Sequence, residues 1–278
     1  MTTRPDSTLL IVEMPELPEV ETVVRSIASL KGRRIVSAEL RGMRVLRGCN
    51  PEEMAERLSN RRIAGLKRFG KFILISLDPE GYLLVHLGMT GKLLTGGSPG
   101  KHTHAILNLD RGVLLYDDPR QFGCFQFSET MPERLRKLGP EPLEVKFEEF
   151  AKSLGARKSS VKSVLLNQRF LRGIGNIYAD EALFRAGIHP KTRGSAISCA
   201  RARRLYDAII AVLTEAIAAG GSSISDYVDA QGRKGFFQVS HRVYQRTGEP
   251  CTRCGAPIRR VIVAQRSSHF CPKCQKRR

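Results

Sequence analysis

Two closely spaced cysteine pairs near the C-terminus constrain the fold of this chain more than any other feature. Cys251 and Cys254 form one C-x-x-C pair, and Cys271 and Cys274 form a second pair after sixteen intervening residues. Each pair can offer two thiolates to one ion, and four sulfurs in a tetrahedral array select zinc. A closed shell of four ligands leaves no position for a reacting group. The pattern predicts one structural Zn²⁺, and disulfides are the less favoured alternative for a cytoplasmic chain.

The stretch between the pairs is long enough for a β-hairpin. One strand is suggested by the apolar residues Ile258, Val261, Ile262 and Val263. Ser267-Ser268 suggests the turn, and Phe270 follows it. Residues 243–278 contain nine Lys or Arg and a single acid. A module this short cannot build an adequate core, so zinc would supply its folding free energy and its basic side chains could face phosphates. We therefore expect a zinc finger with four cysteine ligands that touches nucleic acid.

The whole chain is strongly basic. Its 278 residues include 46 Lys or Arg against 27 acids, a net charge of +19. This excess favours a polyanionic partner, most simply nucleic acid. A membrane surface is a weaker alternative, because no lysine tract or basic amphipathic helix dominates and no stretch approaches the roughly 20 apolar residues that span a bilayer. Residues 1–13 hold only a short apolar run, so we expect no secretory signal and a cytoplasmic protein.

The N-terminal half reads as strands. Val20, Val23, Val24 and Ile27 follow helical spacing and predict an opening helix that ends at Gly32. Five or six strands in an antiparallel sandwich or barrel are expected after it, from short apolar runs punctuated by Gly, Asp and Pro. These runs are "RIVSAEL", "KFILISL", "YLLVHLGMTGKLL", "HAILNLD" and "GVLLYDD".

After residue 142 the pattern becomes helical, and residues 143–151 are a plausible linker. The segment "GIGNIYADEALFRAG" predicts a helix with Asn176 as N-cap and Gly187 at its end. Glycines before a helix N-terminus let backbone amides approach an anion, for which phosphate is the obvious choice here, and an ordinary helical hairpin is an equal alternative. The polar segment 220–237 predicts a long loop, either a lid or a flexible linker.

Several motifs, in order along the chain, resemble one family, the formamidopyrimidine-DNA glycosylases, which are bacterial repair enzymes for oxidised purines. The resemblance runs from residue 14 to about residue 275. Its motifs are "MPELPEVET", "KRFGKFILI", "LGMTG", "DPRQFG", "GIGNIYADEALF" and "CTRCG…QRSSHFCPKCQ".

The resemblance implies an α+β multidomain fold. A catalytic N-terminal antiparallel β-sandwich with a flanking helix would occupy residues 15–142, followed by the linker at 143–151. A helical domain with a helix–two-turns–helix motif would occupy 152–242 and carry a lesion-capping loop at 220–237. A β-hairpin zinc finger would complete the chain at 243–278.

The resemblance also implies a nucleophile. In this family the initiator methionine is removed and the exposed proline nitrogen reacts; Pro15 matches that proline, and Glu16 matches a general acid/base at the deoxyribose ring. A terminal amine has a pKa of about 8, so part of it is unprotonated at neutral pH. It can attack C1′ of a damaged nucleotide, expel the base and form an iminium, which permits β- and then δ-elimination.

The chain departs from the family pattern because Pro15 is internal as written. An amide nitrogen is not nucleophilic, so we expect translation to begin at Met14, with removal of residues 1–14 as the alternative. If neither occurs, Schiff-base activity is excluded. Part of the leader also has a plain helical explanation, because Pro18 suits a first turn and Glu19 complements the helix dipole.

Four matched residues would act on the duplex from the sheet domain. Lys71 would contact phosphates beside the lesion and assist the sugar chemistry. Met89, Arg120 and Phe122 would enter the duplex when the nucleotide is extruded, because Met and Phe can replace lost stacking while Arg offers donors to the orphaned base. Without the resemblance, Met89 and Phe122 would be assigned to the core, and Lys71 to a solvated strand end.

Four more residues would contact DNA from the helical domain and the zinc finger. Asn176 would bind a phosphate, and Arg266 would pair with the backbone at the flipped nucleotide. Lys162 and Tyr244 are placed along the same groove. The resemblance also favours the lid interpretation for the loop at 220–237.

The leading hypothesis is therefore a monomeric, bifunctional DNA glycosylase with AP-lyase activity. It would remove 8-oxoguanine and formamidopyrimidines from double-stranded DNA. A glycosylase for oxidised pyrimidines is the enzymatic alternative, and "PELPEVE" argues against it. A non-catalytic protein that binds damaged DNA is the alternative from another class, and it follows if the chain truly starts at Met1.

Overall fold

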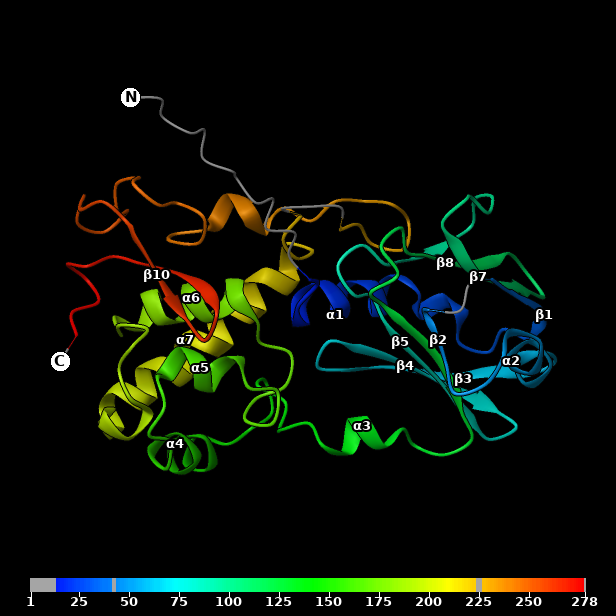
Figure 1. The fold of residues 1–278 in the computed structure, drawn as a ribbon, viewed down its shortest axis with the longest axis horizontal. Coiled ribbons are helices and arrows are strands. Elements are labelled where there is room, and N and C mark those ends of the chain that lie inside the picture. Colours follow the sequence, from blue (N-terminus) through cyan, green and yellow to red (C-terminus); the bar gives the residue numbers. More distant parts are fainter. Residues whose placement is uncertain (1–13, 42–43, 224–226, 278) are drawn as a thin grey trace, which may run out of the picture.

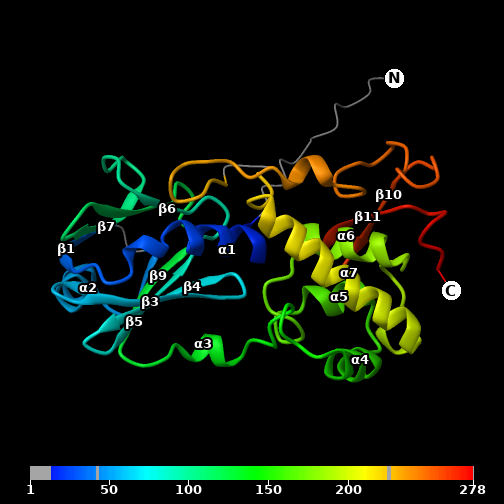
Figure 2. The same ribbon diagram turned by 180° about the vertical axis from the view of Figure 1, so that it is seen from behind.

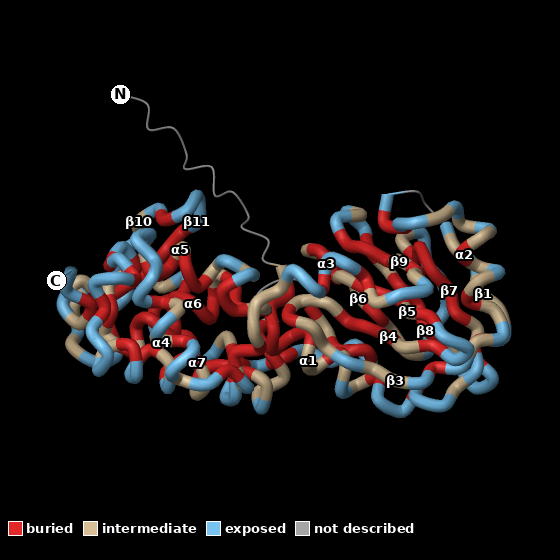
Figure 3. The backbone as a smooth tube through the Cα atoms, turned by 90° about the horizontal axis from the view of Figure 1, so that it is seen from below, coloured by how far each residue is buried: buried red, intermediate tan, exposed pale blue. Residues whose placement is uncertain are grey.

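The computed structural model describes residues 14–41, 44–223 and 227–277. Figure 1 shows a β-rich N-terminal lobe beside a helical C-terminal lobe that carries a β-hairpin. Helix α1 (Leu17–Ser26) lies at their junction. Figure 3 shows a buried interior in each lobe. The expected α+β multidomain fold is confirmed. Of the proposed extension at residues 1–14, residues 1–13 lie outside the described residues.

Two sheets form the β-lobe. The first has the order β1-β7-β8-β6 and the second β2-β9-β5-β4-β3. All pairings are antiparallel except the two-residue pair β2–β9, which is parallel and departs from a purely antiparallel sandwich. The strand bounds are β1 Ile35–Leu40, β2 Leu46–Arg47, β3 Arg62–Phe69, β4 Phe72–Asp78, β5 Gly81–His86, β6 Lys92–Thr95, β7 Thr103–Leu109, β8 Val113–Asp117 and β9 Cys124–Ser128.

The apolar faces of the two sheets share one core. Ile75 and Val85 from the second sheet join Leu107 and Tyr116 from the first in a single buried cluster. Residues at alternate strand positions point to the same face of a sheet, which explains how short apolar runs build this interior. Helix α2 (Pro51–Leu58) begins at a Pro and contacts β1.

Helix α1 serves both cores. Leu17 belongs to the buried cluster of the helical lobe, whereas Val20 and Val23 belong to that of the β-lobe. A short 3₁₀ turn (Ala28–Leu30) follows, and Gly32 then takes a φ of +87°. The opening helix is therefore confirmed, but it ends at Ser26 rather than at Gly32. Its amphipathic pattern ties the lobes together.

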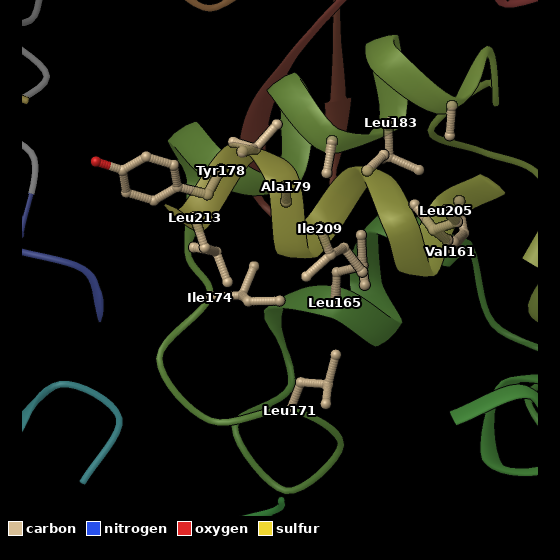
Figure 4. Close-up of a cluster of buried hydrophobic side chains, with 14 of the residues drawn as sticks. Val161, Leu165, Leu171, Ile174, Tyr178, Ala179, Leu183, Leu205, Ile209 and Leu213 are labelled. Carbon is tan, nitrogen blue, oxygen red and sulfur yellow. The ribbon is translucent and has the colours of Figure 1, made fainter. Parts of the chain in front are cut away.

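Four main helices form the second lobe: α4 (Phe147–Gly155), α5 (Val161–Leu166), α6 (Asn176–Ala186) and α7 (Cys199–Ala218). Figure 4 shows α5, α6 and α7 packed around buried aliphatic side chains, with Tyr178 at one end. The short helix α3 (Glu133–Arg136) lies on the segment that joins the lobes. The linker predicted at 143–151 is placed too late, because residues 147–151 already belong to α4.

The C-terminal hairpin differs from its predicted register. Strands β10 (Arg259–Val263) and β11 (Arg266–Phe270) are joined by Ala264 and Gln265, both with positive φ. Two central residues with positive φ are typical of a tight two-residue hairpin. The turn predicted at Ser267-Ser268 is wrong, because both serines are buried in β11.

Among the described residues, no helix combines the length and apolarity needed to cross a bilayer.

Candidate active site at the junction of the lobes

The start of α1 meets the N-terminus of α6. The Glu16 side chain is buried, at 2% exposure, and its carboxylate accepts the amides of Gly175 at 2.7 Å and Ile177 at 3.0 Å. Helix N-termini favour negative charge, because their first amides are unsatisfied and the dipole is positive there. The anion at these two amides is a carboxylate of the chain itself, which corrects the expectation that they receive a phosphate.

Lys71 reaches the same point from the tight turn between β3 and β4. A Cβ at Gly175 would lie 2.3 Å from the Glu16 carboxyl carbon and 2.5 Å from the Lys71 ammonium nitrogen. Both groups therefore lie against the backbone of Gly175, which must be a glycine. The structure thus brings together Glu16, Lys71 and the adjacent, buried Pro15. In the chain as described, the Pro15 nitrogen is in a peptide bond with Met14.

A second carboxylate, Glu19, supports this segment from one turn further along α1. It accepts the Glu16 amide at 2.9 Å, the Ser222 amide at 2.7 Å and the Tyr178 hydroxyl. Burial raises the pKa of Glu19 above the usual glutamate value, and these hydrogen bonds oppose the rise. From the sequence, Glu19 was predicted only to complement the helix dipole, because its partners Tyr178 and Ser222 lie 159 and 203 residues away and leave no local pattern.

A buried ion network holds the β3–β4 turn to the other lobe. The Arg68 guanidinium binds Glu141 through two hydrogen bonds of 3.0 and 2.8 Å and also binds Glu21 at 2.8 Å. Arg172, just before α6, reaches the same Glu141 at 3.1 Å. Burial works against ionisation of Glu21, but hydrogen bonds from Arg25 and Arg68 outweigh it and lower the pKa. Bidentate pairing of this kind fixes geometry as well as charge.

His86 lies near Lys71, at the end of β5. Burial, together with the charges of Lys71 and Arg134, lowers the pKa of His86 to about 4. The imidazole is therefore neutral at physiological pH, and its Nδ1 accepts the Gly88 amide at 3.1 Å. It adds no positive charge beside the lysine. The sequence analysis did not single out His86.

The three residues predicted to enter a duplex lie on two touching turns of the β-lobe. A Cβ at Gly88 would lie 2.5 Å from the Gly123 amide, so the turn carrying Met89 packs on the turn carrying Arg120 and Phe122. Phe122 is 58% exposed, and the Arg120 guanidinium lies 4.9 Å from its ring centre. Both side chains are therefore accessible from outside the β-lobe.

A buried aspartate fixes these two turns. Asp118 is fully buried and accepts the Thr90 hydroxyl at 2.6 Å and the Gly123 amide at 2.8 Å. Thr90 in turn accepts the Arg120 amide at 3.3 Å. The exposed tips are therefore held on a rigid base.

The residues predicted to contact DNA from the helical lobe and the zinc finger differ in whether they are accessible. Asn176 is the first residue of α6 rather than its N-cap, which is Gly175. Arg266 is exposed and directly follows the hairpin turn. Both positions stay compatible with a contact to DNA, and the contacts themselves stay predictions.

Two of these residues are corrected. Lys162 is fully buried, with its ammonium 2.6 Å from Asp180 and 2.8 Å from the Ser267 carbonyl, so it offers no surface to a duplex. A lysine is almost never fully buried unless it is paired, and here the pair joins α5 to α6. Tyr244 is 1% exposed and packs against His241 and His269. Its ring is a core group rather than a surface in the groove.

Two adjacent acids on α6, Asp180 and Glu181, hold the C-terminal module through hydrogen bonds. Neither was predicted from the sequence to do so. Asp180 accepts the His269 amide at 2.8 Å and the Ser268 hydroxyl at 3.0 Å, both from β11. Glu181 accepts the consecutive amides of residues 242–244 at 2.8 to 3.1 Å. The hairpin that carries Arg266 is thus fixed to the helix that begins beside Glu16.

The four paired cysteines form one cluster. Their sulfur atoms all lie within 4.8 Å of one another, with Cys254 and Cys271 at 3.4 Å and Cys251 and Cys274 at 3.9 Å. These separations are too long for a disulfide, whose sulfurs lie about 2 Å apart. They bracket the spacing of about 3.8 Å that a tetrahedron of sulfurs at about 2.3 Å from zinc requires. The donor set therefore fits Zn²⁺.

The described part of the loop at 220–237 crosses from the end of α7 to the β-lobe (Figures 1 and 2). The Ala230 carbonyl accepts the Thr95 amide at 2.9 Å, and the Ala230 amide donates to the Ser26 hydroxyl at 3.1 Å. The loop therefore contacts both α1 and the β-lobe.

Comparison with known proteins agrees with this architecture. Family models match the "Formamidopyrimidine-DNA glycosylase N-terminal domain" at residues 14–125, the "Formamidopyrimidine-DNA glycosylase H2TH domain" at 138–228 and the "Zinc finger found in FPG and IleRS" at 248–277. The formamidopyrimidine-DNA glycosylase of Solibacter usitatus is 67% identical over 264 residues, which cover 95% of this chain and 100% of the relative. That of Methylococcus capsulatus is 44% identical over 273 residues, with the same coverage.

Solved structures show the same correspondence. A Lactococcus lactis Fpg mutant in complex with Fapy-dG-containing DNA matches with a TM-score of 0.88 and 36% identity, covering 95% of this chain and all of that one. The Fpg protein of Thermus thermophilus matches with a TM-score of 0.86 and 40% identity, at the same coverage. Since the matches extend through both lobes and the zinc module, the chain belongs to the formamidopyrimidine-DNA glycosylase family.

Proposed function

We propose that this protein is a base-excision repair enzyme, a DNA glycosylase that removes oxidised purines such as 8-oxoguanine and formamidopyrimidines. The 67% identical relative from Solibacter usitatus is named formamidopyrimidine-DNA glycosylase. Similar solved structures contain DNA with Fapy-dG or with an abasic site. The observation that carries the proposal is the convergence of Pro15, Glu16 and Lys71 at the junction of the lobes.

The proposed chemistry starts from a free Pro15 nitrogen. The secondary amine attacks C1′ of the extruded nucleotide, and the bond from C1′ to the base breaks as the base leaves with a proton. Loss of the amine proton leaves C1′ bonded to both the Pro15 nitrogen and the ring oxygen O4′. Cleavage of the C1′–O4′ bond, with a proton delivered to O4′ by Glu16, then opens the sugar ring and gives an iminium between Pro15 and C1′, which acidifies the C2′ hydrogen. β-Elimination then expels the 3′ phosphate and δ-elimination the 5′ phosphate, which is the AP-lyase activity. Glu16 exchanges protons at the sugar ring, and the Lys71 ammonium offsets phosphate charge.

This chemistry requires a mature chain that begins at Pro15, through translation from Met14 followed by methionine removal. The match to the N-terminal family model begins at residue 14, and the Solibacter usitatus relative is covered over its full length by 95% of this chain. Both observations support a start there. If the nitrogen stays in an amide, the protein becomes the alternative, a binder of damaged DNA without a nucleophile.

The remaining machinery follows from the same geometry. We assign base extrusion to Met89, Arg120 and Phe122 on their rigid turns, and phosphate contacts to Asn176 and Arg266. One structural Zn²⁺ would be held by the four paired cysteines and would keep the hairpin folded, without taking part in the chemistry. We expect a monomer acting on double-stranded DNA.

Borohydride trapping tests the proposal. Protein whose mass confirms a start at Pro15 should form a covalent adduct with duplex DNA that carries 8-oxoguanine, because borohydride reduces the iminium to a stable amine. Protein of confirmed mass that begins at Met1 is the matched control and should form none. Absence of an adduct from the Pro15 form would end the enzymatic proposal.

Pro15→Gly gives a second test. Glycine keeps a terminal amine but loses the ring that orients it, so base excision should fall by about 100-fold while duplex binding stays within about twofold. Unchanged excision would remove Pro15 from the mechanism. Duplexes with an oxidised pyrimidine belong in the same panel, because one similar Lactococcus lactis Fpg structure is a complex with such DNA.

A further inference from the structure

Three segments that lie far apart in the sequence meet on the side chain of Glu19. One carboxylate oxygen accepts the Glu16 amide at 2.9 Å, and the other accepts the Ser222 amide at 2.7 Å and the Tyr178 hydroxyl. The Tyr227 hydroxyl donates to the Glu19 carbonyl at 3.1 Å. The start of α1, helix α6 and the loop at 220–237 therefore share one buried residue.

The contact to Glu16 bears on the nucleophile. The Glu16 amide belongs to the peptide that joins it to Pro15, so the hydrogen bond fixes the plane of that peptide. With that plane fixed, only rotation about the Pro15 Cα–C bond can move the nitrogen relative to it, because the peptide is rigid and the pyrrolidine ring fixes the nitrogen on its Cα. Both carboxylate oxygens of Glu19 receive donors from the protein, so its own role is to hold other groups in place.

The contact to the loop is equally tight. Gly221 has a φ of +81°, and a Cβ there would lie 2.9 Å from a Glu19 carboxylate oxygen and 3.2 Å from the Glu19 Cα. A Cβ at Gly235 would lie 2.3 Å from the Gly221 carbonyl oxygen, so the two ends of the loop are pinched together. We call residues 220–222 and 235 the loop neck. A displacement of the neck cannot occur without displacing Glu19, because no space separates them.

We propose that Glu19 is a positioning residue that couples the loop neck to the Pro15 nucleophile. The neck conformation seen here is then the one in which the nucleophile is aligned for attack. The inference rests on the proposed function, because it requires a reactive amine at Pro15.

Glu19→Gln separates this role from simple packing. Glutamine has the same shape, but one of its two oxygens is replaced by an NH₂ group that cannot accept a hydrogen bond. Only one acceptor oxygen then remains for three donors, so either the Glu16 amide or the Ser222 amide loses its acceptor. The matched control is Glu53→Gln, the same substitution on helix α2 of the β-lobe, at a carboxylate that pairs with Arg57 outside the site.

The first experiment measures borohydride trapping on duplex DNA with an abasic site, under single-turnover conditions and in the Pro15-start form. We expect Glu19→Gln to slow trapping by about 10- to 100-fold, because small misplacements of a nucleophile are costly. Glu53→Gln should stay within about twofold of the parent protein. Binding of a duplex with a tetrahydrofuran abasic analogue should change by no more than about twofold for both variants.

The second experiment tests the loop side with a matched pair of glycines. Gly221→Ala forces a Cβ against Glu19, whereas Gly232→Ala adds one at a φ of +77° with no atom within 4 Å. An abasic site offers no base to cap, so a defect confined to the loop should leave trapping intact. We expect Gly221→Ala to slow trapping by about tenfold and Gly232→Ala to leave it within about twofold.

The outcomes separate the two proposals. If the parent protein itself traps nothing, the proposed function fails before any variant is compared. If the parent protein traps normally, trapping by Glu19→Gln at the parent rate overturns the positioning role. A parallel loss of duplex binding would show that Glu19 is merely structural and would also overturn it. Equal defects in Gly221→Ala and Gly232→Ala would overturn the coupling.

Discussion

At the scale of single residues, Gly175 shows how little room the site has. Its Cα hydrogen faces the Glu16 carboxyl group and the Lys71 ammonium, both closer than a methyl group allows. Such a site tolerates only glycine, because the Glu16 carboxylate is held by the amides of Gly175 and Ile177 and cannot retreat cheaply.

Gly175→Ala should therefore lower base excision by about 100-fold and unfolding free energy by about 1–3 kcal/mol. Single-turnover excision and urea titration measure the two effects. Gly155→Ala, at the end of α4 with no atom within 4 Å of the added Cβ, is the control and should alter neither. A fully active Gly175→Ala variant would show that the site is looser than described.

Single residues were predictable from sequence only where a motif carried them. Pro15, Glu16 and Lys71 stand in short, recognisable motifs, and the structure brings them together. Lys162 was misplaced because a lysine in a basic chain is expected at the surface, and its partner Asp180 lies eighteen residues away on another helix. The contacts of Glu19 join three segments that lie far apart in the sequence, so no local sequence pattern predicts them.

At the scale of secondary-structure elements, α6 is the helix to which both the proposed active site and the C-terminal hairpin are attached. Its first turn holds Glu16, and Asp180 holds both Lys162 and the hairpin strand β11. Breaking a buried ion pair by removing one partner costs far more than an exposed pair contributes, because the other charge is left buried.

Asp180→Asn should lower the unfolding free energy by about 3–5 kcal/mol, because it leaves the Lys162 ammonium buried without its counter-charge. Duplex affinity should fall as well, because the hairpin with Arg266 loses its anchor. Urea unfolding and fluorescence anisotropy provide the readouts. Asp207→Asn, exposed on α7, should stay within about 0.5 kcal/mol of the parent protein. Equal stability of the two variants would contradict this account.

Most elements were predictable because their periodicity is strong, as in the opening helix and the strands β4 and β7. The hairpin turn was misplaced because Ser267-Ser268 has a composition typical of turns. The actual turn is at Ala264-Gln265, where both residues have positive φ although neither residue type favours it. Asn176 was misassigned as the N-cap because asparagine is a favoured N-cap residue. The actual N-cap is the preceding residue, Gly175, whose amide donates to Glu16.

At the scale of the whole molecule, the lobes are joined by α1, the ion network at Glu141 and the loop at 220–237. Their separate cores explain why sequence patterning found two differently built halves. The junction itself could not be predicted, because it is made of contacts between distant segments such as Arg68 with Glu141.

Separate cores predict separate responses to zinc removal. Chelation should weaken duplex binding by about tenfold or more, because the hairpin loses its folding free energy while the β-lobe core holds no zinc ligand. Hydrogen exchange should show lost protection in β10 and β11 and unchanged protection in β4 and β5. Added Zn²⁺ should restore binding and Mg²⁺ should not. Normal binding by verified metal-free protein would contradict the role given to the module.

The account depends most directly on which atom joins the protein to DNA. Borohydride-trapped adduct from the Pro15-start protein can be digested with protease and nuclease, and the modified peptide identified by tandem mass spectrometry. We expect the reduced sugar fragment on the nitrogen of Pro15, at the start of the first peptide. A fragment attached to Lys71, or to any other lysine, would contradict the mechanism.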